Sequence, residues 1–478
     1  MLPLYKNLLA PYPCSVSEKK ENYISLTERH LQAVWLEQKY MRPLMTADGE
    51  PIKVISPGLW NTEAGPDFLK AHLKIGDKEL KGDIEIHLND ASWYAHKHHE
   101  DERYDMVVLH VAFWVPANQN PIISRCGNQV RTTHLENYMT IPLARLVQLI
   151  DLDLYPYKRF TGSGQCSQSL FKNLSEEKIE KLFSSAAYWR CEKKVEYLQS
   201  RFPDRTMQLA GGIAMALGYK HNAEAFIDLF AALLRYRDLS EHELLAIALG
   251  CCGFFEERFV KWEHSNSYRQ LRLLWWGKKD EADFQADLRL DHIRPLNHPV
   301  RRLAYMAKLL QDPRMEDLWF KLINIWCDFA SKDFSSVGTR IIKQQLLDLV
   351  PDYQDPYWNS HFLFEPQSGG HAISFIGKDT KAEIVINVFI PLLQALVKES
   401  GNSKWWESFQ HLYHTFRGIT TSKSRYLQHR FFGNSPKAAI LNTARLSQGA
   451  YQIHKDFCLH YEASCEGCPF VKRYHDSV

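Results

Sequence analysis

The sequence lacks the features that define several common classes of protein. Its longest apolar run, residues 384–397, is interrupted by Asn387, Pro391 and Gln394, so it is too short and too polar for a membrane span. The first residues contain no apolar leader segment, and we expect no signal peptide. A GxxxxGK[ST] phosphate loop, a dinucleotide-binding glycine fingerprint and a GxSxG elbow are all missing. We therefore expect a cytoplasmic protein without a membrane partner.

An excess of one charge and a disulfide pattern are also missing. The 58 Lys and Arg residues nearly balance 56 Asp and Glu residues, so nucleic-acid binding would need a local basic patch. The ten cysteines are mostly scattered singly, which is not the pattern of a disulfide framework. With 478 residues, 45% hydrophobic and 24% charged, the composition is that of a globular protein of two or three domains.

The periodicity of apolar residues changes along the chain and predicts an α+β fold. Residues 1–24 contain three prolines and read as an irregular lead-in. Residues 25–154 alternate between strand and helix patterns, which predicts a mixed α/β domain. Helical periodicity dominates afterwards, and we expect one helical domain at 155–350 and a C-terminal helical region at 351–478.

One predicted strand carries ionisable residues on a single face. Residues 81–89 follow a predicted strand over 68–75 and a Gly-Asp turn, so the two should form a hairpin. Successive side chains of a strand point to opposite faces. Ile84 and Ile86 should therefore face a core, and Glu85 and His87 should share the other face. That face is either a solvated sheet surface or a site for a metal ion or polar substrate.

A Pro-Asp pair before the hairpin adds to this pattern. Pro66-Asp67, followed by Glu85-x-His87, resembles the PD-(D/E)xK nuclease superfamily. The resemblance implies a nuclease-like domain in which Asp67 and Glu85 bind Mg²⁺ or Mn²⁺. His87 stands where the superfamily has lysine, and it would orient or deprotonate the attacking water. The order helix, strand, strand, strand also fits, but residues 91–104 read as irregular where the superfamily has a helix.

A group of histidines follows the same hairpin. His96 and His98 are two residues apart, so in an extended segment their side chains would point the same way. With Glu85 and His87 they could hold a softer metal such as Zn²⁺ or Mn²⁺. The alternative is a surface loop. His110 lies in an apolar strand and reads as a core histidine.

The most specific spacing in the chain is a cysteine cluster near its end. Cys458-x6-Cys465-x2-Cys468 is similar to the start of the iron–sulfur loop of helix-hairpin-helix DNA glycosylases, but the fourth cysteine of that loop is missing. His475 could replace it, which would give a Cys₃His site for zinc. We expect zinc or an iron–sulfur cluster with a structural role; the alternative is three free surface thiols.

A basic and aromatic stretch precedes the cysteines. Arg417, Lys423, Arg425 and Arg430 lie among aromatic residues, a composition suited to phosphates and stacked bases. The alternative is a helix with a solvated basic face. If the first interpretation holds, these four residues are the nucleic-acid-binding residues.

Most of the chain also resembles one bacterial family. The matching segments are Asp48-Gly49-Glu50, Pro57-Gly58, Asn61, Gly65-Pro66-Asp67-Phe68, Gly82, Glu85-Ile86-His87, Trp93, His96, His98, Tyr104-Asp105, Val108-Leu109-His110-Val111, Arg294-Pro295, 442–448 and the C-terminal cysteines. They resemble domain-of-unknown-function family 2851, a resemblance that implies no activity.

Three functions are therefore open. The leading hypothesis is a metal-dependent nucleic-acid hydrolase that uses Asp67, Glu85 and His87. One alternative is a non-catalytic nucleic-acid-binding or scaffold protein with a nuclease-like fold, in which the two carboxylates are capped or lie apart. The other is a zinc-type hydrolase, in which the imidazoles of His96 and His98 converge on Glu85.

Overall fold

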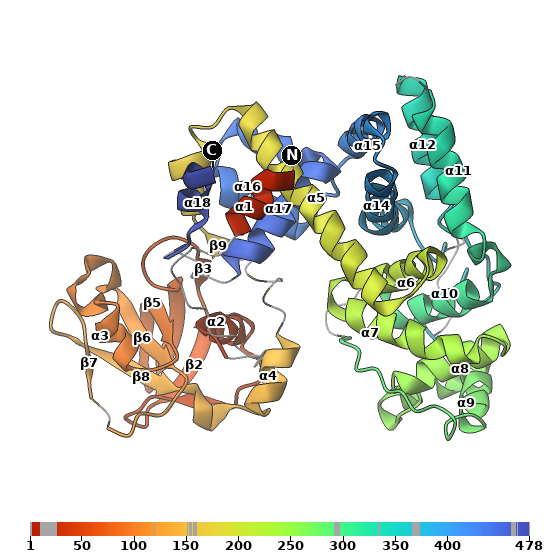
Figure 1. Ribbon diagram of the computed structural model, residues 1–478. Coiled ribbons are helices and arrows are strands. Elements are labelled where there is room, and N and C mark those ends of the chain that lie inside the picture. The colour runs from red at the N-terminus through yellow and green to blue at the C-terminus, as the bar shows by residue number, and fades with distance from the viewer. Residues whose placement is uncertain are drawn as a thin grey trace. The chain divides into compact units, whose positions relative to one another are not determined.

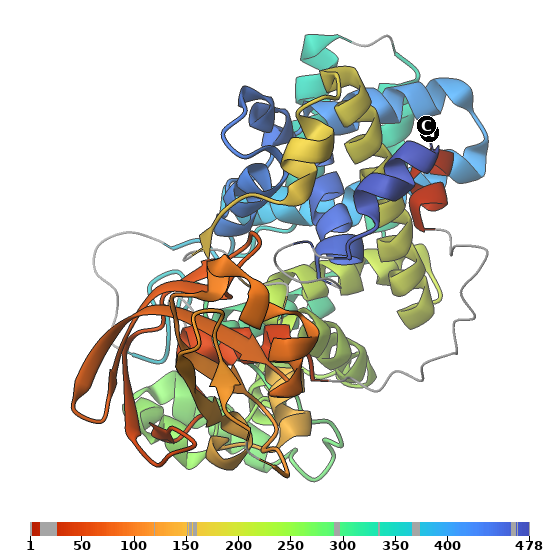
Figure 2. The same cartoon turned by 90° about the vertical axis from the view of Figure 1, so that its left-hand side faces the viewer.

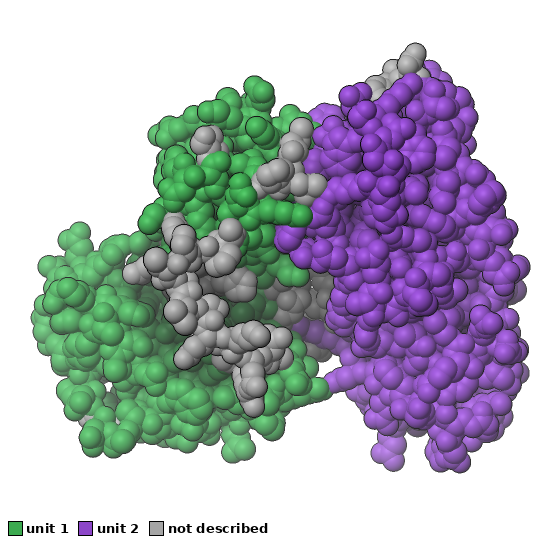
Figure 3. Space-filling view, in the orientation of Figure 1, with its two compact units in different colours: residues 1–187, 420–478 green, residues 188–419 purple. Residues whose placement is uncertain are grey.

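The structure is a computed structural model. It describes every residue except 1, 10–25, 119, 151, 153–154, 156–159, 291–296, 333–334, 366–372, 460–464, 466 and 478. The chain divides into two compact units, each with its own core (Figure 3). Unit 1 combines Met1–Ala187 with Thr420–Val478, and unit 2 is Tyr188–Ile419. The segment 351–478, expected to be one region, is thus divided between the two units.

Unit 1 contains a mixed sheet and unit 2 is helical, so the α+β prediction is confirmed (Figure 1). In the described residues the sheet has nine strands, with the main order β1-β2-β4-β5-β6-β8-β7. The strands are β1 (Leu44–Met45), β2 (Pro51–Ser56), β3 (Leu59–Asn61), β4 (Phe68–Ile75), β5 (Lys78–His87), β6 (Val107–Ala112), β7 (Ile122–Ile123), β8 (Gln129–His134) and β9 (Phe160–Thr161).

The central strands include the one hairpin that the sequence predicted. β4 and β5 form the expected antiparallel hairpin, and Ile75 pairs with Lys78 next to the turn. β6 then runs parallel to β5, which places His110 opposite Glu85. β8 is parallel to β6 on its other side, so the ends of β5, β6 and β8 meet at the same edge of the sheet.

Both faces of this sheet are covered (Figure 1). On one face, α2 (Glu28–Glu37) packs Trp35 into a large core with Ile84 and Ile86 of β5. On the other face, the segment 91–105 packs Trp93 and Tyr104 into a smaller core. The prediction that this segment is irregular is wrong, because it contains α3 (Ala91–Ala95) and two short 3₁₀ turns.

The rest of unit 1 is helical and is built from both ends of the chain. Its helices are α1 (Leu2–Leu9), η5 (Ser167–Phe171), the first part of α5 (Glu176–Arg201), α16 (Ser422–Phe432), η11 (Pro436–Asn442), α17 (Ala444–Ile453), η12 (His454–Cys458) and α18 (Phe470–Ser477). The predicted irregular lead-in is wrong for α1, and residues 10–24 lie outside the described residues. α1 and α18 lie side by side (Figure 2), and Arg473 of α18 donates to the carbonyl of Leu8.

Unit 2 is a set of packed helices joined by one long connection. Its helices are the rest of α5, α6 (Arg205–Leu217), α7 (Tyr219–Leu233), α8 (Glu241–Cys251), α9 (Asn266–Trp276), α10 (Pro299–Gln311), α11 (Leu318–Ala330), α12 (Ser336–Asp348), α13 (Lys378–Ile384), α14 (Ile390–Ser400) and α15 (Ser403–Thr415). α8 begins at Ser240 with the capping box that the sequence indicates. Residues 351–365 contain no helix and belong to this connection.

The apolar run of unit 2 belongs to a longer helix than the sequence suggested. α13, a π-helical turn at Val385–Phe389 and α14 continue from Lys378 to Ser400, 23 residues in all. Among the described residues this is one helix that could cross a membrane by length and composition. Because 67% of its apolar window is buried inside the protein, and buried core helices pass the same test, it is weak support for a membrane span.

Candidate metal centre

The predicted ionisable face of β5 exists, but it is buried. Ile84 and Ile86 enter the core under α2, and Glu85 and His87 point to the opposite side of the sheet. There Glu85 is only 5% exposed and His87 only 1% exposed. The segment 91–105 covers them, so the interpretation of a solvated sheet surface is wrong. A buried carboxylate needs partners because desolvation of its charge is costly.

Three imidazoles converge over this face. The ligand atoms of His87, His96 and His98 all lie within 4.8 Å of one another, the one such group among the described residues. His87 and His98 are buried and stacked, and His96 is exposed. Solvent therefore reaches one member of the group, His96, whereas the other two are covered.

His96 and His98 approach His87 for a different reason from the one that the sequence suggested. We expected an extended segment, in which residues two apart point the same way. Instead His96 directly follows the last residue of α3, Lys97 adopts a left-handed conformation with φ 59°, and His98 begins a 3₁₀ turn. The reversal at Lys97 folds His98 back over β5 beside His87.

Glu85 lies between two of these imidazoles. Its Oε1 is 3.3 Å from Nε2 of His87 and 3.1 Å from Nε2 of His98. Its Oε2 accepts a hydrogen bond of 3.1 Å from the backbone N–H of Asp67. The imidazoles of His87 and His98 therefore meet at Glu85; the zinc-type alternative expected those of His96 and His98 there, so it is met for His98.

A second row of polar groups supports His87 from behind. Nδ1 of His87 lies 2.9 Å from Nε2 of His110, and Nδ1 of His110 lies 3.6 Å from Oδ1 of Asp90. Oδ2 of Asp90 lies 2.9 Å from Nε2 of His134. If each imidazole carries one proton directed toward Asp90, Nε2 of His87 keeps its lone pair for a ligand. Second rows of this kind orient metal-binding histidines.

Sequence reasoning missed Asp90 and His134 and assigned His110 to the core. The prediction for His110, a hydrogen-bonded histidine of the core, is confirmed, because it is fully buried and its Nε2 lies 2.9 Å from Nδ1 of His87. The signal was the pair of histidines in β6 and β8, because parallel neighbours of β5 end at the same edge as His87. Without knowledge of the strand order, that signal could not be used.

The protonation states suit metal binding. Burial, followed by the nearby imidazoles of His110, His98 and His96, holds the pKa of His87 well below its usual value. Burial also lowers the pKa of His110 to about 4. Both rings are therefore neutral at physiological pH, which is the form that binds a metal. Buried Nε2 of His87 forms no hydrogen bond, only the contact with Glu85, so the donor set fits an ion.

Asp67 has other partners. Its Oδ1 accepts a hydrogen bond of 2.6 Å from Nε2 of Gln32, and its Oδ2 accepts one of 3.0 Å from the backbone N–H of Ile86. The main chain of Asp67 thus approaches Glu85, but its carboxylate is capped and lies outside the histidine group. Capping of this carboxylate is what we expected for the non-catalytic binding or scaffold alternative.

The basic stretch is not one exposed surface. Lys423 is only 4% exposed and Arg430 only 2% exposed, so neither side chain can reach a phosphate as predicted. Both lie on the buried side of α16, whereas Arg425 is exposed. Arg417 is exposed too, but it belongs to unit 2. The helical period explains the difference within α16, because it places Lys423 and Arg430 on one side of the helix and Arg425 on another.

The predicted C-terminal ligands differ in their exposure. Cys458, Cys465 and Cys468 are partly buried in unit 1. The side chain of His475 is exposed on α18, one residue beyond the buried Tyr474. The cysteine that accompanies the three C-terminal thiols is Cys166, which precedes η5.

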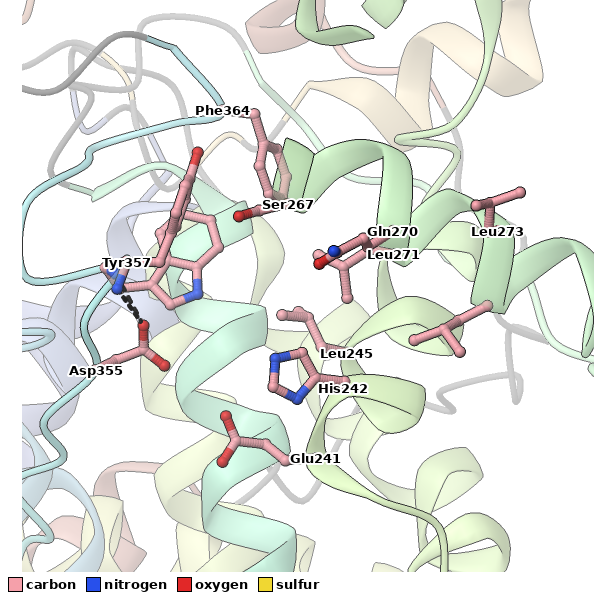
Figure 4. Close-up of a pocket in the computed structure, with 12 residues that line it drawn as sticks. Glu241, His242, Leu245, Ser267, Gln270, Leu271, Leu273, Asp355, Tyr357 and Phe364 are labelled. Carbon is pink, nitrogen blue, oxygen red and sulfur yellow. Dashed lines mark hydrogen bonds between the residues drawn. The ribbon is translucent and has the colours of Figure 1, made fainter. Parts of the chain in front are cut away.

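Unit 2 contains a cavity that the sequence did not indicate. It measures about 490 Å³ and is lined by His242 of α8, Leu271 of α9 and Tyr357 of the connection (Figure 4). Two acids at its wall, Glu241 and Asp355, both pair with Lys308, at 2.7 and 3.0 Å. No residue predicted to form a site lines this cavity.

The fold and the site define the class: an α+β protein whose mixed sheet carries a buried histidine–carboxylate centre suited to a metal ion. Within this class the chain belongs to a family described as "Protein of unknown function (DUF2851)", whose model matches residues 28–418. No curated protein and no solved structure matches the chain.

Proposed function

We propose that this protein is a metal-dependent hydrolase whose ion is a transition metal such as Zn²⁺, held by His87, His96 and His98 beside Glu85. The convergence of three imidazole ligand atoms within 4.8 Å carries the proposal. Nitrogen donors favour Zn²⁺ over Mg²⁺, which prefers oxygen. The domain would be cytoplasmic, as the sequence suggests.

Each residue of the centre would have its own role in hydrolysis. When bound, such an ion lowers the pKa of a water molecule and polarises a substrate oxygen. Glu85 lies within 3.3 Å of two ligand nitrogens, so it is placed to accept a proton from a water molecule at the centre. His110 and Asp90 hold the ring of His87 in one orientation. The exposed side of His96 is the route for substrate.

Metal binding tests the ligand set directly. Zinc titration of metal-depleted protein, followed by calorimetry and elemental analysis, should find a zinc site that His98→Gln and His96→Gln weaken at least about tenfold. The matched control is His72→Gln, because His72 lies in β4 of the same domain and pairs with Glu79 outside the group. Equal zinc affinity of wild type and His98→Gln would refute the proposal.

A nucleic-acid hydrolase with Mg²⁺ or Mn²⁺ at Asp67 and Glu85 is the second candidate. One observation favours it: β2, β4 and β5 lie next to one another in the sheet after α2, and the short helix α3 and the parallel strand β6 follow, which is the order that the PD-(D/E)xK resemblance implies if the short strands β1 and β3 are left out. The short contact between the main chain of Asp67 and Glu85 also places both residues at one corner of the sheet.

Cleavage assays separate the candidates. DNA, RNA and p-nitrophenyl esters would be incubated with Zn²⁺, Mg²⁺ or Mn²⁺. The histidine centre predicts that His98→Gln abolishes hydrolysis and that Asp67→Asn leaves most of it. The two-carboxylate site predicts that Asp67→Asn abolishes it and that His96→Gln leaves most of it. No hydrolysis of any substrate by the wild type would favour the non-catalytic binding or scaffold alternative.

A further inference from the structure

Four cysteines meet in the helical part of unit 1. Cys166 is separated from the C-terminal three by most of the chain, yet Cys458, Cys465 and Cys468 all raise its pKa, after the larger effect of burial. Burial, then the thiols of Cys465 and Cys468, also raise the pKa of Cys458 to about 12. The four thiols therefore influence one another electrostatically, and the hydrogen bonds around them indicate how their segments are held.

Hydrogen bonds tie the segments that carry these cysteines to the helices α16 and α2. Nη2 of Arg430, on α16, donates to Sγ of Cys465 at 2.7 Å. The carbonyl of Arg430 accepts from the backbone N–H of Gly164 at 2.8 Å, which ties the turn that carries Cys166 to the same residue. Arg29 of α2 donates to the carbonyl of Cys458 at 2.7 Å. Three distant segments are thus held together at this place.

Two buried cations lie beside this region. Arg430 donates to Sγ of Cys465 and to the carbonyl of Thr62, and Arg29 donates to the carbonyls of Cys458 and Tyr155. Without a metal, burial keeps the thiols of Cys166 and Cys458 neutral, because it raises the pKa of both. A bound metal would convert such thiols to thiolates, and the two guanidinium groups would then lie beside the negative charge.

The backbone of the C-x2-C segment is also shaped for ligation. Cys465 adopts a left-handed conformation with φ 67°, although it is not glycine, and Gly467 follows with φ 68°. The backbone N–H of Cys468 donates to the carbonyl of Cys465 at 3.1 Å, which closes a tight turn. Tight turns of this kind direct two thiols to one centre. The strain of a non-glycine residue in this conformation is typical of functional positions.

The spacing of the thiols distinguishes one ion from a larger group. Four sulfurs around one tetrahedral zinc lie about 3.8 Å apart, since the Zn–S bond is about 2.3 Å. Among the described residues, no three thiols come within 4.8 Å of one another. A cluster of iron and sulfide ions holds its cysteine ligands farther apart than a single ion does.

We propose that Cys166, Cys458, Cys465 and Cys468 ligate an iron–sulfur cluster in unit 1. Cys166 takes the place of the fourth cysteine that the C-terminal spacing lacks, and the exposed His475 has no part in the site. The cluster would join the segment before α5 to the end of the chain.

Iron analysis of protein purified without oxygen tests the proposal. The wild type should contain about four iron and four sulfide ions per chain, with broad absorption near 400 nm that reductant bleaches. Cys166→Ser should lower iron content at least about tenfold. Cys191→Ser is the matched control, because Cys191 is equally buried but lies in unit 2. His475→Ala should retain the iron of the wild type.

Two results would overturn the proposal. Zinc without iron in the wild type would exclude a cluster, whatever the variants do. Retained iron in Cys166→Ser, with loss in His475→Ala, would restore the Cys₃His set. If Cys166→Ser does not fold, the iron and sulfide content of the wild type and the His475→Ala comparison still decide the ligand set. Neither result depends on the histidine centre of the α/β domain.

Discussion

Two neighbouring carboxylates in unit 1 have different surroundings. Both oxygens of Asp67 accept hydrogen bonds from the scaffold, whereas Oε1 of Glu85 faces two imidazoles. The residue type at a motif position therefore does not decide what that residue does. Its role depends on the hydrogen-bond donors around it, and these donors come from elements outside the motif.

Loss of the donor to Asp67 should be costly. Gln32 is fully buried, so Gln32→Leu leaves one oxygen of Asp67 without this partner. We expect unfolding to become easier by about 1–3 kcal/mol. Urea denaturation followed by circular dichroism would measure the change. The double variant Gln32→Leu/Asp67→Asn completes a double-mutant cycle. If its loss of stability equals the sum of the two single losses, Gln32 and Asp67 do not interact as assigned.

A pH effect follows from His30. Its Nδ1 accepts from the backbone N–H of Thr27 at 3.2 Å, and burial, then the charge of Arg29, lowers its pKa from 6.5 to about 4. The fold requires the neutral ring, so the stabilisation is complete above pH 6.5 and is lost as pH falls toward 4. The largest loss is about 3 kcal/mol.

His30→Gln is the matched variant for this prediction. Glutamine fits the same position of a capping box and does not titrate. Denaturation at a series of pH values should therefore give a smaller loss of stability for His30→Gln than for the wild type. Parallel curves for the two proteins would show that His30 is not responsible.

At the scale of elements, the sequence predicted the pieces better than their relations. Alternation in residues 81–89 correctly separated Ile84 and Ile86 from Glu85 and His87. It could not tell that the polar face is buried, because the cover comes from 91–105. The convergence of His96 with His98 depends on one left-handed residue, Lys97, which periodicity does not reveal.

The long connection of unit 2 depends on one buried arginine of α10. Arg301 donates to the carbonyls of Trp358, at 2.6 Å, and Ser374, at 3.0 Å, and also to that of His361. Arg301→Lys keeps the charge but not the planar fork, so some of these carbonyls lose their donor. We expect a loss of about 2–4 kcal/mol in the free energy of unfolding.

Arg314→Lys serves as the control for this change. Arg314 is on the same unit, pairs with Asp312 and is largely exposed, so its replacement should change stability by less than about 0.5 kcal/mol. Thermal and urea denaturation of both variants would compare them. Equal effects of the two substitutions would mean that the carbonyl contacts of Arg301 contribute little.

At the scale of the whole molecule, unit 1 is discontinuous in sequence and unit 2 is continuous. Sequence reasoning found the change from α/β to helical patterns but placed the boundaries at 154 and 350. It had no signal that residues 420–478 return to the first unit, since helix–helix packing across long separations leaves no local pattern. Cys166 was missed as a partner of the C-terminal cysteines for the same reason.

This division predicts how fragments behave. Residues 188–419 contain a core of their own and should fold as a helical fragment with cooperative thermal unfolding. Residues 1–187 alone should not fold fully, because Phe171 and Phe183 pack against Phe431 and Phe432. Addition of 420–478 should restore near-ultraviolet circular dichroism and protease resistance. A stable 1–187 fragment would contradict the division.

The return of residues 420–478 to unit 1 has a consequence for biosynthesis. A ribosome makes the chain from its N-terminus, so the sheet is finished long before the helices that complete the same unit. Unit 2 can fold first, while Phe171 still lacks its partners Phe431 and Phe432, which have not yet been synthesised. During that interval the apolar surface of unit 1 is uncovered and open to chaperone binding. Mutations that slow translation of the final segment should therefore increase aggregation of the nascent protein.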